Sequence, residues 1–86
     1  MLSIEEICRE LQKIDRTCTD ISGRLERERG EIINSMNKAQ STFGGTQEGQ
    51  GVVLRFSDAL NKIVYADDSL YSLRSSIQQL INRIKK

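Results

Sequence analysis

Two heptad patterns of apolar residues, separated by Phe43-Gly44-Gly45, occupy the two halves of this 86-residue chain. In both halves the apolar residues alternate steps of three and four, which keeps them on one side of an α-helix and favours a left-handed supercoil. The first pattern comprises Ile4, Ile7, Leu11, Ile14, Cys18, Ile21, Leu25 and Ile32. The second comprises Val52, Phe56, Ala59, Ile63, Ala66, Leu70, Leu73, Ile77, Leu80 and Ile84. The sequence therefore predicts an all-α fold, an antiparallel two-helix hairpin.

Local signals set the expected helix boundaries. Ser3 and Glu6 fit a capping box at the start of the first helix. We expect Gly44 or Gly45 to adopt the left-handed conformation that ends this helix, and Thr46 to cap the next one. The expected organisation is a single domain over residues 1–86, with a helix at 3–41, a turn at 42–46 and a helix at 47–85.

The matched lengths of the two halves allow two registers between the helices. In the first, Ile14 lies level with Ile77. In the second, Leu11 lies level with Leu73. Both registers place the turn at the glycines, so both stay open at the level of sequence.

The composition argues against several classes of function. The net charge is only +1, whereas a nucleic-acid-binding protein would carry a basic face. The chain has no histidine, the commonest general base and metal ligand, and its two cysteines are too few for a zinc site. The glycines around the turn do not match a phosphate-binding loop. We therefore expect no enzyme, no catalytic residue, no cofactor and no bound metal.

The two cysteines, Cys8 and Cys18, are not expected to pair with each other. Ten residues on a helix correspond to about 15 Å, and a disulfide requires Cα atoms within about 7 Å. Cys18 falls in the apolar stripe and should act as a small buried side chain. Cys8 falls beside the stripe, where an intermolecular role stays open.

A second apolar line on the second helix is expected to bind another polypeptide. Its members lie to one side of the main stripe, so they cannot all face the first helix, and a broad apolar face is normally buried. Two polar residues interrupt the line, as in seams that specify register or partner. The predicted partner interface comprises Val53, Leu60, Val64, Asp67, Tyr71, Arg74 and Ile81. We expect two hairpins to form a four-helix bundle, as a homodimer or a heterodimer; an exposed, slightly apolar helix is the alternative.

The turn Phe43-Gly44-Gly45 resembles the Trp-x-Gly turn of the WXG-motif proteins, the small early-secreted-antigen-like proteins of bacterial type VII secretion. Phe43 matches the aromatic residue of that turn and Gly45 matches its glycine. Together with about 40 helical residues on either side, the resemblance covers nearly the whole chain. It implies a secreted helical hairpin that dimerises side by side and is exported as a folded pair without a cleaved signal peptide. Members of the family act as substrates or as partners that escort a larger effector.

The chain departs from this family at the export signal, a Tyr-x-x-x-Asp/Glu that follows the second helix. Tyr65 is followed four residues later by Ser69, and Tyr71 by Ser75. The resemblance then implies that a partner carries the signal, or that the chain is an accessory that binds the helical domain of a toxin. The sequence shows no signal peptide and no membrane span, so we expect synthesis in the cytoplasm, and secretion if the resemblance holds.

Two functional hypotheses follow. The first is a non-enzymatic helical protein-binding module, either a type VII secretion substrate or an accessory partner of an effector or toxin. The second is a cytoplasmic structural coiled coil or adaptor unrelated to secretion, in which Phe43 is a passive turn residue.

Overall fold

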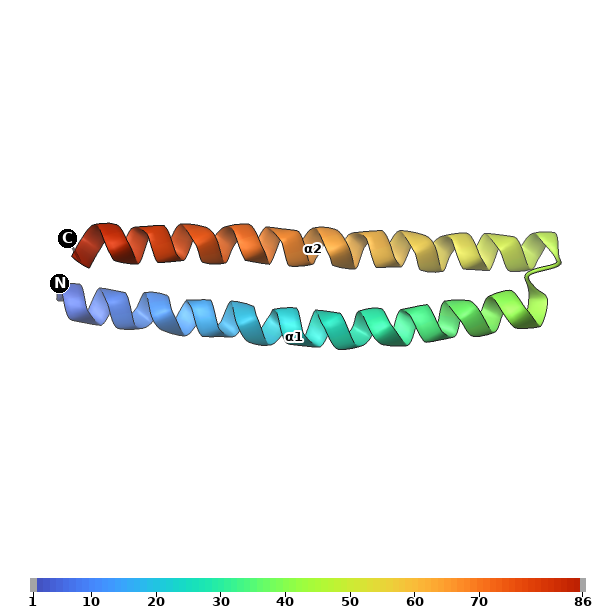
Figure 1. The fold of residues 1–86 in the computed structure, drawn as a ribbon, viewed down its shortest axis with the longest axis horizontal. Helices are drawn as coiled ribbons and strands as arrows, with labels where there is room; N and C mark the ends of the chain where they lie inside the picture. The colour runs from blue at the N-terminus through green and yellow to red at the C-terminus, as the bar shows by residue number, and fades with distance from the viewer. Residues whose placement is uncertain (1, 86) are drawn as a thin grey trace.

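Two long antiparallel helices make up the fold in the computed structural model, which describes residues 2–85 (Figure 1). Helix α1 spans Ile4–Phe43 and helix α2 spans Gln47–Lys85. The hairpin measures 61 × 18 × 15 Å, with the first and last turns side by side at the end opposite the loop. The expected all-α antiparallel hairpin is confirmed. The pairing of two hairpins into a bundle stays a prediction.

The start of α1 follows from its first residues. The Ser3 hydroxyl oxygen accepts a hydrogen bond from the backbone N–H of Glu6 at 3.1 Å, which satisfies one of the free N–H groups of the first turn. The same hydroxyl donates to the Glu6 carboxylate at 3.2 Å. Ser3 is therefore the N-cap, and its two bonds with Glu6 hold the chain at the point where the helix begins.

The turn after α1 depends on close backbone approach and contains no left-handed glycine. Gly44 ends α1 with a right-handed helical conformation, φ −65° and ψ −15°, and no described glycine has a positive φ. The expectation of a left-handed Gly44 or Gly45 is therefore wrong. A Cβ atom at Gly44 would overlap the backbone oxygen and the side chain of Gln40, whereas Gly45 has open space around it. Gly44 is required because any larger residue would collide with the last turn of α1.

Thr46 caps α2, as the sequence predicts. Its Oγ1 accepts a hydrogen bond from the backbone N–H of Gly49 at 2.9 Å and donates to the carbonyl oxygen of Phe43 at 2.8 Å. A Cβ atom at Gly49 would overlap that Phe43 carbonyl. Gly49 therefore lets the first turn of α2 lie directly against the end of α1.

Two sets of contacts show which faces of the helices meet. Nε of Arg74 donates to Oδ1 of Asp15 at 3.1 Å, across the two helices. One heptad closer to the termini on each helix, Cys8 and Ile81 pack together. They form a buried cluster with Ile77, and Leu11 and Ile84 pack against it. The helices therefore meet along heptad positions that include these residues.

We call the seam the set of residues that continue these heptad positions along both helices. On α1 the seam comprises Cys8, Leu11, Asp15, Cys18, Ser22, Leu25, Arg29, Ile32, Met36 and Ala39. On α2 it comprises Gly49, Val53, Phe56, Leu60, Ile63, Asp67, Leu70, Arg74, Ile77, Ile81 and Ile84. All of them except Arg29 are buried or half-buried, as expected for side chains between two helices.

Each helix is rotated by about one residue position relative to the predicted stripe. One of the two predicted rows on each helix lies in the seam, but the other row faces outward, with Ile14 48% and Leu73 47% exposed. Neither expected register is observed, because the Asp15–Arg74 bond places Ile14 level with position 75 rather than Ile77, and Leu11 level with position 78 rather than Leu73. The Asp15–Arg74 bond and the apolar residues near the turn together favour the observed rotation. The predicted stripe would place polar residues at positions 28 and 35 against α2, whereas the observed seam continues through Met36 and Ala39 to the turn.

Candidate functional site

The seam divides the surface of the hairpin into two long sides. On one of them, residues from both helices line a depression of about 230 Å³: Leu25, Glu26, Arg29, Ile63, Val64, Asp67 and Asp68. Four of these seven residues are charged, so we call this the polar side. It is a poor place to bury against another protein, because each charge would need a partner once water is removed.

The opposite side is apolar. Glu26 of α1 and Val64 of α2 lie next to the seam on the polar side. Each helix has another heptad row next to the seam on its other edge, and these two rows lie together on the opposite side of the hairpin. We call this the apolar side, and its members are Ile7, Ile14 and Ile21 of α1 with Ala66, Leu73 and Leu80 of α2. Their heptad spacing aligns them in one apolar strip near the chain termini, and large exposed apolar patches are rare on monomeric proteins.

The exposure of this strip is substantial. Ile14, Leu73 and Leu80 are 48%, 47% and 42% exposed, and the other three members are half-buried. The sequence patterns had placed all six residues between the two helices. They were missed as surface residues because they belong to the same apolar stripe as the seam residues next to them. A signal did exist: Asp15 and Arg74 carry opposite charges, and each lies one residue from a position of the predicted stripe.

The structure divides the predicted partner interface into two parts. Ile81 is 4% exposed in the cluster with Cys8, and Arg74 is hydrogen-bonded to Asp15. Three more members continue the seam and are half-buried: Val53, Leu60 and Asp67. These five residues face α1 because α2 is rotated from its expected orientation, so they are engaged within the single chain.

The other two members of the predicted interface, Val64 and Tyr71, face solvent. They are 45% and 74% exposed, and Val64 lines the depression of the polar side. A partner that binds at these two residues stays a prediction.

The predicted turn motif lies at the tip of the hairpin. The carbonyl oxygen of Phe43 accepts hydrogen bonds from the backbone N–H and the hydroxyl of Thr46, at 3.1 Å and 2.8 Å. The Phe43 side chain itself is 40% exposed. The backbone of this residue therefore shapes the turn together with Gly44, while its ring remains accessible at the surface.

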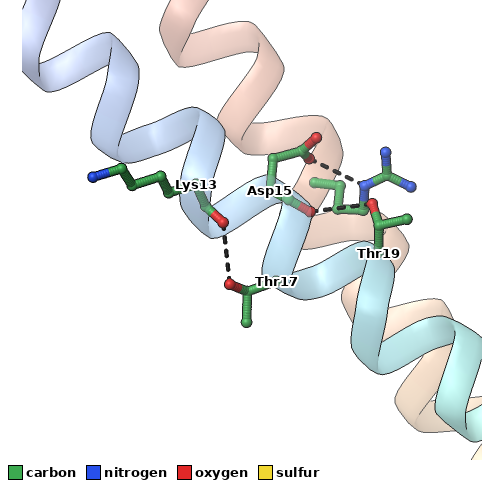
Figure 2. A network of polar contacts seen from close by, with 5 residues as sticks. Lys13, Asp15, Thr17 and Thr19 are labelled. Atoms are coloured by element: carbon green, nitrogen blue, oxygen red, sulfur yellow. Dashed lines mark hydrogen bonds and ion pairs between the residues drawn. The ribbon is translucent and has the colours of Figure 1, made fainter.

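An ion pair between Asp15 and Arg74 interrupts the apolar seam (Figure 2). The Asp15 side chain is 14% exposed and that of Arg74 is 40% exposed. The hydrogen bond to Asp15 raises the pKa of the Arg74 guanidinium. Figure 2 also shows the hydroxyl of Thr19 donating to the backbone oxygen of Asp15, at 3.2 Å.

This ion pair specifies how the two helices align. If one helix slipped by a heptad, Asp15 would lie opposite either Asp67 or Ile81. The first arrangement brings two negative charges together, and the second leaves a carboxylate against an apolar side chain. The pair thus acts like the polar residues that fix the register of coiled coils.

Both cysteines are reduced and lie in the seam, with Cys8 5% and Cys18 4% exposed. Burial in the seam agrees with the prediction for Cys18. Cys8 is equally buried, so the intermolecular role left open for it would require the two helices to separate.

Residues 2–85 also lack the features of a metal site and of a membrane-spanning helix. No three His, Cys, Asp or Glu side chains in this part of the chain are grouped so that they could hold a metal ion. Neither helix, over its described length, has a stretch apolar enough to cross a membrane.

Comparisons with known proteins found no relative: no family model, no curated protein and no solved structure matches the chain. The likeness to type VII secretion proteins therefore depends on the Phe43-Gly44-Gly45 turn and the two heptad patterns alone.

Proposed function

We propose that this protein is a non-enzymatic helical protein-binding module, which becomes fully stable when a helical partner covers it. The observation that supports this most directly is its surface area. The hairpin exposes 6756 Å², whereas a compact monomer of 9.8 kDa exposes about 5,200 Å². The excess, about 1,600 Å², is similar to the total area that a stable protein–protein interface buries.

The small core supports the same proposal. The buried apolar residues are Cys8, Cys18, Ala39, Ile77 and Ile81, and no described side chain is less than 2% exposed. Domains of this size are marginally stable even when they are compact. Near the chain termini, each helix also carries apolar residues in a third row beside the two rows of the seam, and three rows are typical of helices in a bundle rather than in a two-stranded coiled coil.

Light scattering and circular dichroism of the purified protein test this proposal together. We expect a dimer or larger assembly whose thermal midpoint rises with protein concentration, because association stabilises the folded state by mass action. A chain that is monomeric and incompletely folded would also support the need for a partner. A fully folded, stable monomer at micromolar concentration would contradict the proposal and favour a self-sufficient structural hairpin.

A narrower form of the proposal links the module to type VII secretion, as a substrate or as an accessory of an effector or toxin. Its support is the aromatic-x-glycine turn between two arms of matched length. Detection of the protein in culture supernatant, with and without the secretion ATPase of the same cell, tests this form. Retention in the cell in both cases, with no secretion ATPase or toxin gene nearby, would leave only the general binding module.

A further inference from the structure

We infer that the partner is a second copy of this chain, bound through the apolar side, with the turns of both hairpins at the same end. This inference rests on the proposed function and adds to it the binding face, the partner and the orientation. The two copies would be related by a twofold axis parallel to the helices, which places α1 of each copy on α2 of the other.

The heights of the apolar residues favour this arrangement. Asp15 is bonded to Arg74 and the helices run in opposite directions, so Ile14 and Leu73 differ in height by two residues, about 3 Å along the hairpin. A twofold axis along the hairpin preserves height, so it places Ile14 of each copy against Leu73 of the other. One heptad away in either direction, Ile7 would meet Leu80 and Ile21 would meet Ala66. Every isoleucine of the apolar side would therefore face an apolar residue, in a self-complementary interface.

The alternative twofold arrangement, which we call end-over-end, places the turns of the two copies at opposite ends and lacks this match. It would place α1 on α1 in opposite directions, so the isoleucines near the N-terminus would meet the part of the same row near the turn. That part of the row carries Glu28, Ser35 and Thr42, all exposed and polar. Ile14 would lie near Ser35 and Ile21 near Glu28, which loses most of the apolar contact.

Charge favours the same choice. Outside the apolar row of α2, the next row carries only basic charges: Arg55, Lys62 and Arg83. The end-over-end arrangement would bring two such rows together, which is unfavourable. With α1 on α2, Glu28 of each copy lies level with Ala59 of the other, within one helical turn of Lys62. These opposite charges then meet at the edge of the interface.

The available area is sufficient for a dimer. A contact about 10 Å wide, the diameter of a helix, along the whole 61 Å of the hairpin covers roughly 600 Å² on each copy. The six apolar residues supply the part near the chain termini, about 21 Å along each helix. The pair would bury roughly 1,200 Å² in total, at the lower end of the range for stable interfaces. The polar side has similar length but would bury the charges around Arg29 and Asp67.

Matched substitutions identify the face. Light scattering of the full chain should give twice the mass of 9.8 kDa. Leu73→Asp should abolish dimer formation, with at least a hundredfold loss of affinity. Tyr71→Asp, two residues away and facing the other side, should change affinity less than threefold. If Tyr71→Asp dissociates the dimer and Leu73→Asp does not, the apolar side is the wrong face.

A distance between two turns tests the orientation without disturbing the interface. A spin label at Gly45→Cys has open space around it, and Cys8→Ala with Cys18→Ala removes the native thiols. Electron paramagnetic resonance should then give a label-to-label distance of about 30 Å or less, the width of a few helices. The end-over-end dimer would give a distance near the 61 Å length of the hairpin.

The outcomes separate this inference from the proposed function. A long distance between the labels, or a chain that stays monomeric and poorly folded at all concentrations, overturns the second-copy arrangement but leaves a partner-binding module. A fully folded stable monomer overturns both. A dimer with a short distance that is lost in Leu73→Asp supports both.

Discussion

The first and second heptads of the seam, counted from the chain termini, follow the same pattern but are stabilised differently. At the end, the paired positions hold Cys8 and Ile81, which are 5% and 4% exposed. One heptad further, the same positions hold Asp15 and Arg74, which make a hydrogen bond of 3.1 Å. The pattern that builds an apolar cluster at the end of the seam therefore builds an ion pair one heptad further along.

The difference shows that the two regions contribute different things to the fold. Burial of apolar side chains at the end lowers the free energy of the folded hairpin. An ion pair with one partly exposed member contributes little net stability, but its geometry excludes slipped alignments. The terminal cluster should therefore dominate stability, while the Asp15–Arg74 pair should dominate register.

Removing apolar volume at the end should give the largest effect. We expect Ile81→Ala to lower the free energy of unfolding by about 2–4 kcal/mol, because it leaves a cavity beside Cys8 and Ile77. Urea denaturation at a fixed protein concentration measures this value. Leu54→Ala is the matched control, because Leu54 is 66% exposed and should cost less than about 0.5 kcal/mol. Equal losses for the two variants would show that the terminal cluster is not the main source of stability.

The hairpin itself could be predicted because its signals are local. The N-cap Ser3, the cap Thr46 and the low-propensity segment around Gly44 each act through hydrogen bonds or contacts within a few residues. Such interactions do not depend on how the two helices are rotated. The helix bounds therefore differ from the expected ones by at most two residues, at the end of α1.

The face of each helix could not be predicted because it depends on the other helix. Three neighbouring rows on α1 contain apolar residues. The row of Leu11 and Cys18 lies between the helices whether its partner row is that of Ile14 or that of Asp15. Choosing between Ile14 and Asp15 as the neighbouring seam position requires knowing that Arg74 lies opposite. Hydrophobic period alone favours Ile14, which is why the sequence predicts the row of Ile14 in the seam in place of the row of Asp15.

Substitutions in the middle of α1 should stabilise the hairpin by a smaller amount. Gly23 and Gly30 lie inside the helix with nothing near the position of an added Cβ atom. We expect Gly23→Ala and Gly30→Ala each to raise the free energy of unfolding by about 1 kcal/mol, through helix propensity. Thermal denaturation at a fixed protein concentration measures the gain.

Gly49→Ala is the contrasting control for these glycines, since its Cβ would overlap the Phe43 carbonyl and should lower stability. If Gly23→Ala or Gly30→Ala instead weakens dimer formation, these two glycines form a contact strip for another helix. That result would add a second surface to the apolar side.

The smallest expected effect on stability is that of the Asp15–Arg74 pair, and it tests the second heptad of the seam directly. In a double-mutant cycle with Asp15→Asn and Arg74→Gln, we expect a favourable coupling smaller than the loss in Ile81→Ala, decreasing as salt screens the pair. The raised pKa of Arg74 places the loss of its charge at strongly alkaline pH, so this contribution is present below that range. Raising the pH from about 6 to 9 should therefore leave the coupling unchanged, because the guanidinium stays charged throughout. Additive single mutants would show that the pair contributes nothing to the hairpin, and the register would then have to depend on the apolar residues and the turn alone.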